Sequence, residues 1–175
     1  MALWYIGPNP TVDLVQIRLD RPLPEVLLVR RKIAPFIGKW AFPGGFLDPK
    51  VVLTSAPTVP TYFIAAETPI QAAIREYIEE TGDTTSSEHP LVYVGTYTGP
   101  GRDPRETQER WTTTTAYAFI NHNPPSNFTP QEREILDVDW HPITPNLLAE
   151  MAFDHARILT DALTVLGIPL AILGL

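Results

Sequence analysis

The stretch Glu67–Gly82, ETPIQAAIREYIEETG, predicts one amphipathic helix whose two ends are marked in the sequence. Thr68 is followed by Pro69 and Gln71, which together are the signature of a helix start: a hydroxyl N-cap, a proline at the first position and a capping-box partner. Gly82 predicts the helix end. Apolar residues between these ends recur at helical spacing and predict one buried face. They are Ile70, Ala73, Ile74, Tyr77 and Ile78.

The same helix gathers like charge on another face. Glu76, Glu79 and Glu80 stand at i, i+3 and i+4, where like charges repel by a few tenths of a kcal/mol per pair. They also crowd the helix C-terminus, where the helix dipole disfavours anions. Arg75 relieves part of the repulsion by pairing with Glu79. A divalent cation, Mg²⁺ or Mn²⁺, would turn the repulsion into coordination, whereas a solvated helix face is the alternative that spacing alone leaves open.

Composition limits the classes of protein and ligand. The 175 residues, 44% of them hydrophobic, suit one compact domain covering residues 1–175. The net charge of −7 repels nucleic acid and anionic membranes, so neither is expected as a partner, and an anionic ligand would need a bridging cation. With no cysteine, disulfides, thiolate metal sites and cysteine nucleophiles are excluded.

The two ends of the chain show no targeting segment. MALWYIGPNP lacks the basic lead and apolar run of a secretory signal, so a cytoplasmic location is expected. The apolar C-terminal stretch ALTVLGIPLAILGL is interrupted by Gly167 and Pro169 and is too short to span a membrane. We expect it to dock on the domain.

The remainder of the chain predicts a sheet covered by helices. Five segments carry the β-branched and aromatic bias of strands, and a second helix is predicted to follow Asp154, with Ile158, Ala162, Val165 and Leu166 on its buried face. The strands are residues 12–19, 25–31, 91–98, 111–120 and 134–140. Residues 49–66, rich in proline, match neither pattern and look like an insertion that forms no clear element.

Within the helix, REYIEETG resembles the core of the Nudix box, GX5EX7REUXEEXGU, in which U is a bulky apolar residue. Glu67 stands at the required distance before Arg75, and FPGG at 42–45 resembles the glycine pair that opens the box. Two departures are visible. Gly45 and Glu67 are 22 positions apart where the pattern has six, so the box carries an apparent 16-residue insertion, which we place within residues 49–66. Asp83 stands where the pattern has an apolar residue, which should cost core burial but removes no ligand.

This resemblance implies an α/β fold, the α/β/α sandwich with a mixed sheet, and metal-dependent hydrolysis of a nucleoside diphosphate derivative. It implies Glu76 and Glu80 as the leading metal ligands, with Glu79 as a third ligand or the partner of Arg75. The carbonyl of Gly44 is a further candidate ligand. The resemblance also places Glu67, Arg75 and Glu79 in the catalytic group and Gly45 against the substrate. For the base, Glu106 and Glu109 are candidates by loop position.

A second segment bears on the substrate. GRDPR at 101–105, leading into a strand, resembles the Nudix domains that handle ADP-ribose in bacterial NAD metabolism, as does MAFDHARILTDAL at 151–163. Arg102 and Arg105 are therefore predicted to bind substrate, or alternatively to fix the loop by pairing with Asp103 and Glu106. The expected reaction converts ADP-ribose to AMP and ribose 5-phosphate. A nucleotide-sensing module and a hydrolase of nucleoside triphosphates or other dinucleotides are the alternatives, and a homodimer is a further expectation.

Two other sets of residues, one basic and one of histidines, are not expected to take part in catalysis. The basic run Arg30, Arg31 and Lys32 ends a predicted strand, where a solvated role is the default and a phosphate contact is the alternative. The histidines show no metal-ligand spacing, so surface or helix-capping roles are expected for all of them. They are His89, His122, His141 and His155.

Overall fold

A computed structural model describes residues 3, 6–54, 61–84, 90–99, 101–130 and 133–174 of the protein. Within these ranges the side chains of residues 49–54, 61–66 and 172 are not described. His89 lies outside the described residues. Among the residues that the structure describes, every helix is too short or too polar to traverse a lipid bilayer.

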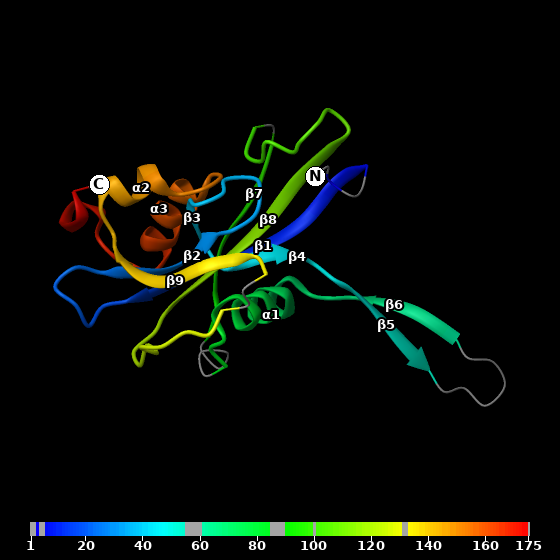
Figure 1. Ribbon diagram of the computed structural model, residues 1–175, viewed down its shortest axis with the longest axis horizontal. Helices are drawn as coiled ribbons and strands as arrows, with labels where there is room; N and C mark the ends of the chain where they lie inside the picture. Colours follow the sequence, from blue (N-terminus) through cyan, green and yellow to red (C-terminus); the bar gives the residue numbers. More distant parts are fainter. Residues whose placement is uncertain are drawn as a thin grey trace.

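A seven-stranded sheet forms the centre of the molecule (Figure 1). Its path runs β3-β2-β1-β8-β7, while β4 adds to β1 and β9 adds to β2. The strands are β1 (Gly7–Arg18), β2 (Glu25–Arg31), β3 (Trp40–Ala41), β4 (Gly44–Phe46), β7 (Val92–Thr98), β8 (Arg110–Ile120) and β9 (Ile135–Pro142). The five predicted strands are all present, and the short β3 and β4 were not predicted.

The sheet is mixed, as expected. β1 and β8 are parallel, from Gly7 opposite Arg110 to Ile17 opposite Ile120. The remaining pairs within this sheet are antiparallel, including β4, whose Gly44 and Gly45 face Asp13 and Val12 of β1. The glycine turn of the box is therefore a short strand fixed against the middle of the sheet.

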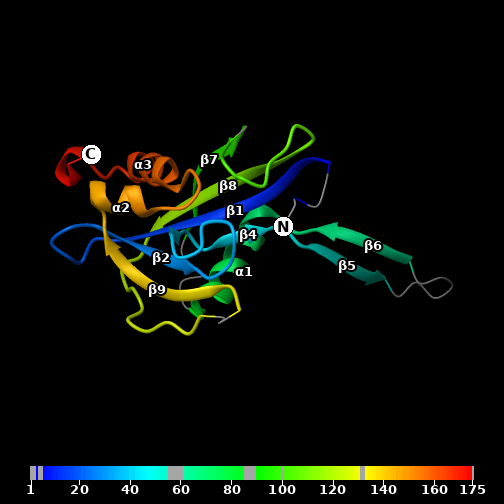
Figure 2. The same ribbon diagram turned by 45° about the horizontal axis from the view of Figure 1, so that its top comes forward.

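Helices cover both faces of the sheet (Figures 1 and 2). α1 (Pro69–Thr81) lies on one face, and α2 (Pro145–Glu150) and α3 (His155–Val165) lie on the other. The short 3-10 helix η2 (Leu170–Leu173) follows α3, and Leu173 packs in the core, so this part of the tail docks on the domain. The predicted α/β/α sandwich is confirmed.

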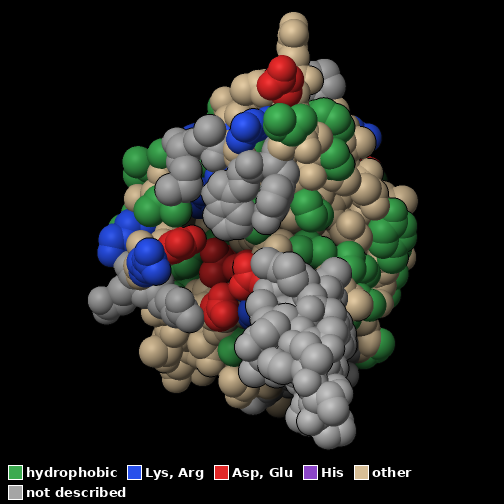
Figure 3. Space-filling view, turned by 90° about the vertical axis from the view of Figure 1, so that its right-hand side faces the viewer, with side chains coloured by type: hydrophobic (Ala, Val, Ile, Leu, Met, Phe, Trp, Pro, Cys, Tyr) green, Lys and Arg blue, Asp and Glu red, His purple; other side chains and the backbone are tan. Residues whose placement is uncertain are grey.

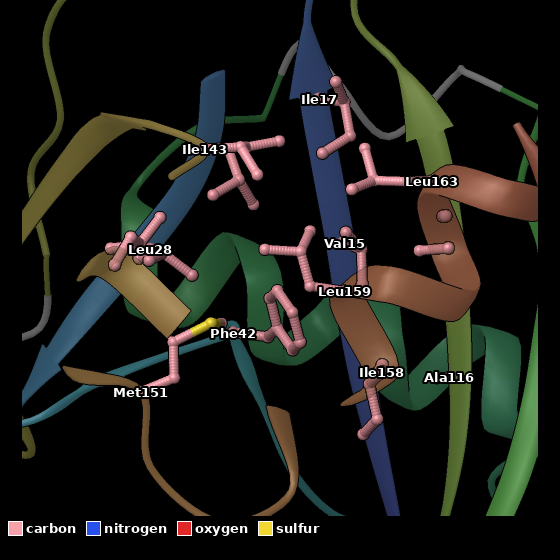
Figure 4. Close-up of a cluster of buried hydrophobic side chains, with 14 of the residues drawn as sticks. Val15, Ile17, Leu28, Phe42, Ala116, Ile143, Met151, Ile158, Leu159 and Leu163 are labelled. Carbon is pink, nitrogen blue, oxygen red and sulfur yellow. The ribbon is translucent and has the colours of Figure 1, made fainter. Parts of the chain in front are cut away.

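Two apolar clusters fill the spaces between the sheet and its helices. On the α3 side, Val15, Leu28 and Phe42 pack against Ile158 and Leu159 (Figure 4). On the α1 side, β-strand residues such as Val12 and Leu27 pack against Ala73 and Tyr77. Successive side chains of β1 point to opposite faces of the sheet, so Val15 and Ile17 join the first cluster and Val12 and Leu14 the second.

The ends of α1 are those that the sequence predicts, and its predicted buried face is confirmed in part, at Ala73 and Tyr77. Thr68 accepts from the Gln71 amide in a complete capping box, and Gly82 takes the left-handed conformation at φ 74°. The buried residues are Ala72, Ala73, Tyr77 and Thr81, whereas Ile70 is 46% exposed. Small residues let α1 approach the sheet closely, and the resulting rotation turns Glu76 and Glu80 inward.

Residues 49–66 do form an element, contrary to expectation. β5 (Pro49–Thr54) and β6 (Thr61–Ala66) pair as an antiparallel hairpin in a sheet of their own, and the hairpin projects from the body (Figures 1 and 2). Pro49 is the register partner of Ala66, so the two ends of the hairpin meet. Glu67 therefore stays beside the glycine turn, and its carboxylate accepts from the Asp48 amide at 3.0 Å.

Asp83 is buried rather than lost from the core. Its carboxylate accepts a hydrogen bond from the Tyr77 hydroxyl at 2.6 Å, and the same hydroxyl lies 2.8 Å from the Gln16 side-chain oxygen. A hydroxyl has one proton to donate, so donation to Asp83 requires the Gln16 amide to present its NH₂ group to the Tyr77 oxygen. The expected loss of burial at Asp83 is thus replaced by a buried polar network.

The C-terminal prediction was right for part of its length. Ile158 and Ala162 are fully buried on α3, but Val165 is 46% exposed at the last helical residue. Residues 151–154 precede the helix, and the Ala152 amide donates to the Trp40 carbonyl at 2.7 Å. This segment runs beside β3 and brings the start of α3 next to the glycine turn.

Candidate active site

The glutamates of α1 meet the glycine turn at two adjacent positions. Glu80 accepts a hydrogen bond from the Gly44 amide at 3.0 Å. A Cβ atom added to Gly45 would lie 2.4 Å from Oε1 of Glu76, so only glycine leaves room for that carboxylate. The Leu14 amide donates to the Pro43 carbonyl at 2.9 Å, so the backbone groups of the next residue, Gly44, face away from β1, and its amide points to Glu80.

Arg75 holds the remaining carboxylates together. Its guanidinium donates to both oxygens of Glu67 at 3.0 Å, to Glu76 at 2.9 Å and to Glu79 at 3.2 Å. It also donates to the Phe46 carbonyl at 2.9 Å, which ties α1 to β4. The hydrogen bonds with Glu67 are the first cause that raises the pKa of Arg75. The predicted Arg75–Glu79 pair is present, but Glu67, 3% exposed, is the stronger partner.

Burial makes two of the glutamates unusual acids. Burial raises the pKa of Glu76 to about 7, although the charge of Arg75 opposes the shift. Burial also raises the pKa of Glu80 well above its usual range, against the Gly44 hydrogen bond. Each carboxylate is costly to ionise where it stands, and a bound cation would remove that cost. On the face seen in Figure 3, acidic side chains gather in one hollow with basic side chains beside them.

The donor set suits a hard divalent cation in part. Within the described ranges, no three carboxylate or imidazole side chains assemble as a complete metal-binding group. Arg75 binds one oxygen each of Glu76 and Glu79, and the Glu79 side chain is 42% exposed. Glu76 and Glu80, together with the outward-facing backbone of Gly44, supply oxygen donors of the type that Mg²⁺ and Mn²⁺ prefer.

The loop between β7 and β8 closes on itself. The Glu106 carboxylate accepts from the Gly101 amide at 3.0 Å and from the Thr112 amide and hydroxyl at 3.1 and 2.9 Å. These bonds engage both of its oxygens in fixing the loop, which leaves it little freedom to act as a base. Arg105 pairs with Asp103, as the alternative interpretation of this loop expected.

The two arginines predicted to bind substrate occupy different environments. The Arg102 guanidinium, 10% exposed, donates to both oxygens of Asp154 at 2.8 and 3.0 Å. The Arg105 guanidinium lies over the Phe46 ring, 5.6 Å from its centroid, and so borders the glycine turn. Substrate binding by either residue remains a prediction, and Arg105 is the one beside the carboxylates.

Arg31 reaches the same region, although the sequence favoured a solvated role for the whole basic run. Its Nε donates to the Pro35 carbonyl at 2.8 Å, and its guanidinium lies 5.0 Å from the centroid of Phe153. Burial lowers the pKa of Arg31, while the charge of Glu80 raises it and that of Arg105 lowers it further. Among the described residues, no carboxylate lies within the 4.0 Å that defines an ion pair with Arg31.

Comparison with known proteins identifies the family. The NUDIX domain family matches residues 7–162, so the chain belongs to it. The chain is 30% identical to an ADP-ribose pyrophosphatase of Methanocaldococcus jannaschii over 90% of its length and 74% of that protein. The predicted class of enzyme, a Nudix pyrophosphohydrolase, is thereby confirmed.

Several solved structures share the fold at 25% identity or more, and two of them contain a bound nucleotide. The NUDIX domain of Shewanella oneidensis NrtR, complexed with ADP ribose, is 26% identical with a TM-score of 0.71, and the match covers 93% of this chain and 90% of that one. A bifunctional NMN adenylyltransferase/ADP ribose pyrophosphatase from Francisella tularensis, complexed with AMP and a manganese ion, is 25% identical with a TM-score of 0.64. That match covers 91% of this chain and 42% of the Francisella one.

Proposed function

We propose that the protein hydrolyses the pyrophosphate bond of ADP-ribose with the aid of Mg²⁺ or Mn²⁺. One water molecule is consumed, and AMP and ribose 5-phosphate are released. The observation that carries the proposal is the meeting of Glu76 and Glu80 with the adjacent glycines Gly45 and Gly44. The similarity to an ADP-ribose pyrophosphatase and to an ADP-ribose-bound NUDIX domain supports the choice of substrate.

In this proposal Glu76 and Glu80 hold the cation, with the Gly44 carbonyl as a backbone donor and Glu79 as the third carboxylate. The cation, when bound, neutralises the pyrophosphate and lowers the pKa of the attacking water. Arg75 and Glu67 keep α1 registered on β4, because Arg75 binds both Glu67 and the Phe46 carbonyl. Gly45 leaves the space for Glu76 that any other residue would fill.

Arg31 and Arg105 would receive the substrate oxygens that the cation does not. Their charges interact with each other, and the charge of Glu80 also acts on Arg31. Two guanidinium groups beside a cation-binding cluster suit a substrate with two phosphates, because each phosphate keeps a negative charge. Arg31 is fixed by Pro35 and Phe153 before any substrate binds, which reduces the entropy lost on binding.

The direct test is to incubate the purified chain with ADP-ribose and Mg²⁺ and to separate the products by chromatography. AMP and ribose 5-phosphate in equal amounts are expected, and their release should stop with EDTA and in the Glu80→Gln variant. A panel including nucleoside triphosphates and dinucleoside polyphosphates tests the substrate. Faster hydrolysis of one of these would replace ADP-ribose as the substrate while leaving the enzyme class in place.

A second candidate function is the binding of ADP-ribose without hydrolysis. It is favoured by the similarity to the NrtR NUDIX domain, which was solved with ADP ribose. The two candidates differ in one measurement, since a pure sensor would bind ADP-ribose in calorimetry and release no AMP with Mg²⁺ present. A homodimer is proposed as the assembly for either function, and light scattering would test it.

A further inference from the structure

The segment Phe153–His155, where α3 begins, departs from ordinary helix-start chemistry at three successive residues. Phe153 has φ of +52°, a left-handed conformation that non-glycine residues rarely adopt. Asp154 is the N-cap, yet its side chain makes no capping hydrogen bond. His155 is only 4% exposed although it is polar. A strained backbone and an unused helix cap must be offset by contacts elsewhere in the protein. The side chains of Asp154 and His155 both make such contacts.

His155 holds the strand that leads into the glycine turn. Its Nδ1 accepts a hydrogen bond from the Phe42 amide at 3.0 Å, and its ring stacks on the Phe42 ring with centroids 4.8 Å apart. Phe42 itself is anchored in the core, where its ring lies among Met151, Ile158 and Leu159 (Figure 4). The residue held in this way stands two positions before Gly44, whose amide donates to Glu80.

The other ring nitrogen reaches the strand that pairs with the turn. Nε2 of His155 lies 3.3 Å from Asp13, and Asp13 also accepts from the Thr114 hydroxyl at 2.7 Å. Since Nδ1 accepts the Phe42 amide proton, a neutral His155 carries its own proton on Nε2 and donates it to Asp13. Asp13 is the register partner of Gly44, so His155 touches both strands that form the turn.

Asp154 holds the loop 101–106, the other segment that is predicted to bind substrate. Both of its oxygens bind Arg102, at 2.8 and 3.0 Å, in the bidentate geometry that fixes a guanidinium most firmly. Arg102 also donates to the Thr112 hydroxyl at 2.9 Å, and Thr112 binds Glu106, which closes the loop. The Asp154 side chain therefore binds Arg102 of this loop and does not cap its own helix.

We propose that Asp154 and His155 are positioning residues that fix the metal-binding glycine turn and the loop 101–106 relative to each other through one rigid helix start. The two residues have different roles. His155 fixes the geometry at Gly44 and therefore affects cation binding. Asp154 fixes the loop and therefore affects substrate binding. This inference rests on the proposed function for the identity of the substrate, but its metal arm does not depend on turnover.

The predicted effect of His155 on cation binding is tested by titrating the full chain with Mn²⁺ in the absence of substrate. Electron paramagnetic resonance measures the free Mn²⁺ and so gives the affinity. In His155→Gln the side-chain amide can reach Asp13 but leaves the Phe42 amide without its acceptor, so Mn²⁺ affinity should fall about 10- to 100-fold, as for other residues that orient metal ligands. In His155→Asn the side-chain oxygen lies near the position of Nδ1, so much of the affinity should return. Equal Mn²⁺ affinity in wild type and His155→Gln would overturn the proposal.

The substrate arm is tested by steady-state kinetics with ADP-ribose. Asp154→Asn and Arg102→Gln should each raise KM about 10-fold while Mn²⁺ affinity stays within about 2-fold of wild type. The KM of the double variant should not exceed that of the single variant with the higher KM, because the two residues act as one pair. The matched control is Asp161→Asn, which removes a carboxylate on the same helix that accepts from Tyr97 at 2.8 Å. A KM in Asp154→Asn no higher than in this control would overturn the proposal.

The remaining outcomes are also decisive. If His155→Gln fails to fold, as shown by circular dichroism, the metal arm passes to His155→Asn, in which a loss of Mn²⁺ affinity beyond about 10-fold would contradict the proposal. If the wild-type chain binds Mn²⁺ but releases no AMP, the proposed function fails alone, and Kd for ADP-ribose from calorimetry replaces KM. Lower melting temperatures in all variants with unchanged Mn²⁺ and substrate binding would reduce both residues to a structural role.

Discussion

The Glu80 carboxylate accepts a hydrogen bond from the Gly44 amide at 3.0 Å, which joins the last turn of α1 to the glycine turn of the sheet. The bond satisfies one oxygen of a half-buried carboxylate whose pKa is raised well above its usual range by desolvation. The position of the Glu80 side chain is fixed by this hydrogen bond and does not depend on its charge. An amide in its place would keep the hydrogen bond and lose the charge.

Glu80→Gln should abolish turnover while the fold survives. The glutamine oxygen can still accept from Gly44, and removing a buried charge relieves a desolvation cost, so the melting temperature should be equal to or above that of wild type. Loss of a direct ligand should lower kcat/KM by more than about 100-fold, since residues that only orient ligands already cost 10- to 100-fold. Paired melting curves and ADP-ribose assays measure both effects. An unchanged rate would remove Glu80 from the site.

Adding a methyl group at each of the two glycines should have different consequences. In Gly45→Ala the new Cβ would lie 2.4 Å from the Glu76 carboxylate, a mobile side-chain end, so the protein should fold with displaced Glu76 and weakened Mn²⁺ binding. In Gly44→Ala the Cβ would lie 2.2 Å from the Val12 carbonyl, which is backbone and cannot move aside. Gly44→Ala should therefore lose about 1–3 kcal/mol of unfolding free energy or more.

Chemical denaturation with Mn²⁺ titration separates these two effects. Gly38→Ala is not a suitable control because Gly38 has φ of +80°. Ala41→Gly, at a neighbouring buried site in β3, reports the cost of a change in backbone freedom instead. Similar metal affinity in Gly45→Ala and wild type would show that Glu76 can bind the cation from another position.

The metal-free protein should lose stability as pH rises from about 4.5 to about 7. Glu76 has its pKa raised from 4.5 in the unfolded chain to about 7 in the folded protein, so the folded state binds the extra proton within this window. By linkage, the free energy of unfolding falls as pH increases there, by on the order of 1–3 kcal/mol. Urea melts at several pH values with EDTA measure the slope.

The control for this pH dependence is Glu76→Gln, which should reduce the slope in the same window; the part that remains comes from Glu80, whose pKa burial also raises. Saturating Mg²⁺ should restore stability at pH 8, because the cation takes over the role of the proton. A metal-free protein whose stability rises steadily between pH 5 and pH 7 would contradict the buried, strained state of this carboxylate.

Arg31→Gln should raise KM for ADP-ribose about 10- to 100-fold, the usual cost of a lost hydrogen bond to a charged group, with a smaller change in kcat. Arg30→Gln is the matched control, because Arg30 is exposed and its Nε donates to the Gly38 carbonyl. Parallel kinetics of the two variants measure the difference. An equal KM in both would return Arg31 to the solvated role that its sequence position favoured.

Shortening the β5–β6 hairpin to a tight turn between Pro49 and Ala66 should leave the fold and Mn²⁺ binding intact. These residues are register partners, so their ends already meet without the intervening chain. A change in KM with an unchanged molecular mass would assign the hairpin to substrate binding. A change in mass by light scattering would assign it to assembly.

Much of this architecture could be read from the sequence because its signals are local. The cap Thr68, the stop Gly82 and the alternating strands each depend on neighbours within a few positions, and all of them are found where predicted. The rotation of α1 was not predictable in this way. Ile70 and Ala72 are both apolar, and which of them is buried depends on how closely β4 approaches the helix.

Residues that organise the site through long-range contacts were missed. The sequence predicts a solvated role for Arg31, like its exposed neighbours, and a capping or surface role for His155. No residue close to either one in the sequence indicates which residue it contacts in the fold. A polar residue inside the apolar run of β1, Asp13, was the available signal, since a buried carboxylate requires a partner of its own. That partner, His155, comes from the other end of the chain.

The parallel pairing of β1 with β8 joins Gly7 to Arg110 and Ile17 to Ile120, so the centre of the sheet closes only after most of the chain is available. Contacts between residues so distant in sequence slow folding, because the entropy of the intervening loop is lost before the contact forms. A newly made chain would thus carry α1, with its three glutamates, and the preceding Glu67 well before β8 is synthesised. Refolding should be slower than in helical domains of similar length, and the ability to bind Mn²⁺ should appear in its last phase.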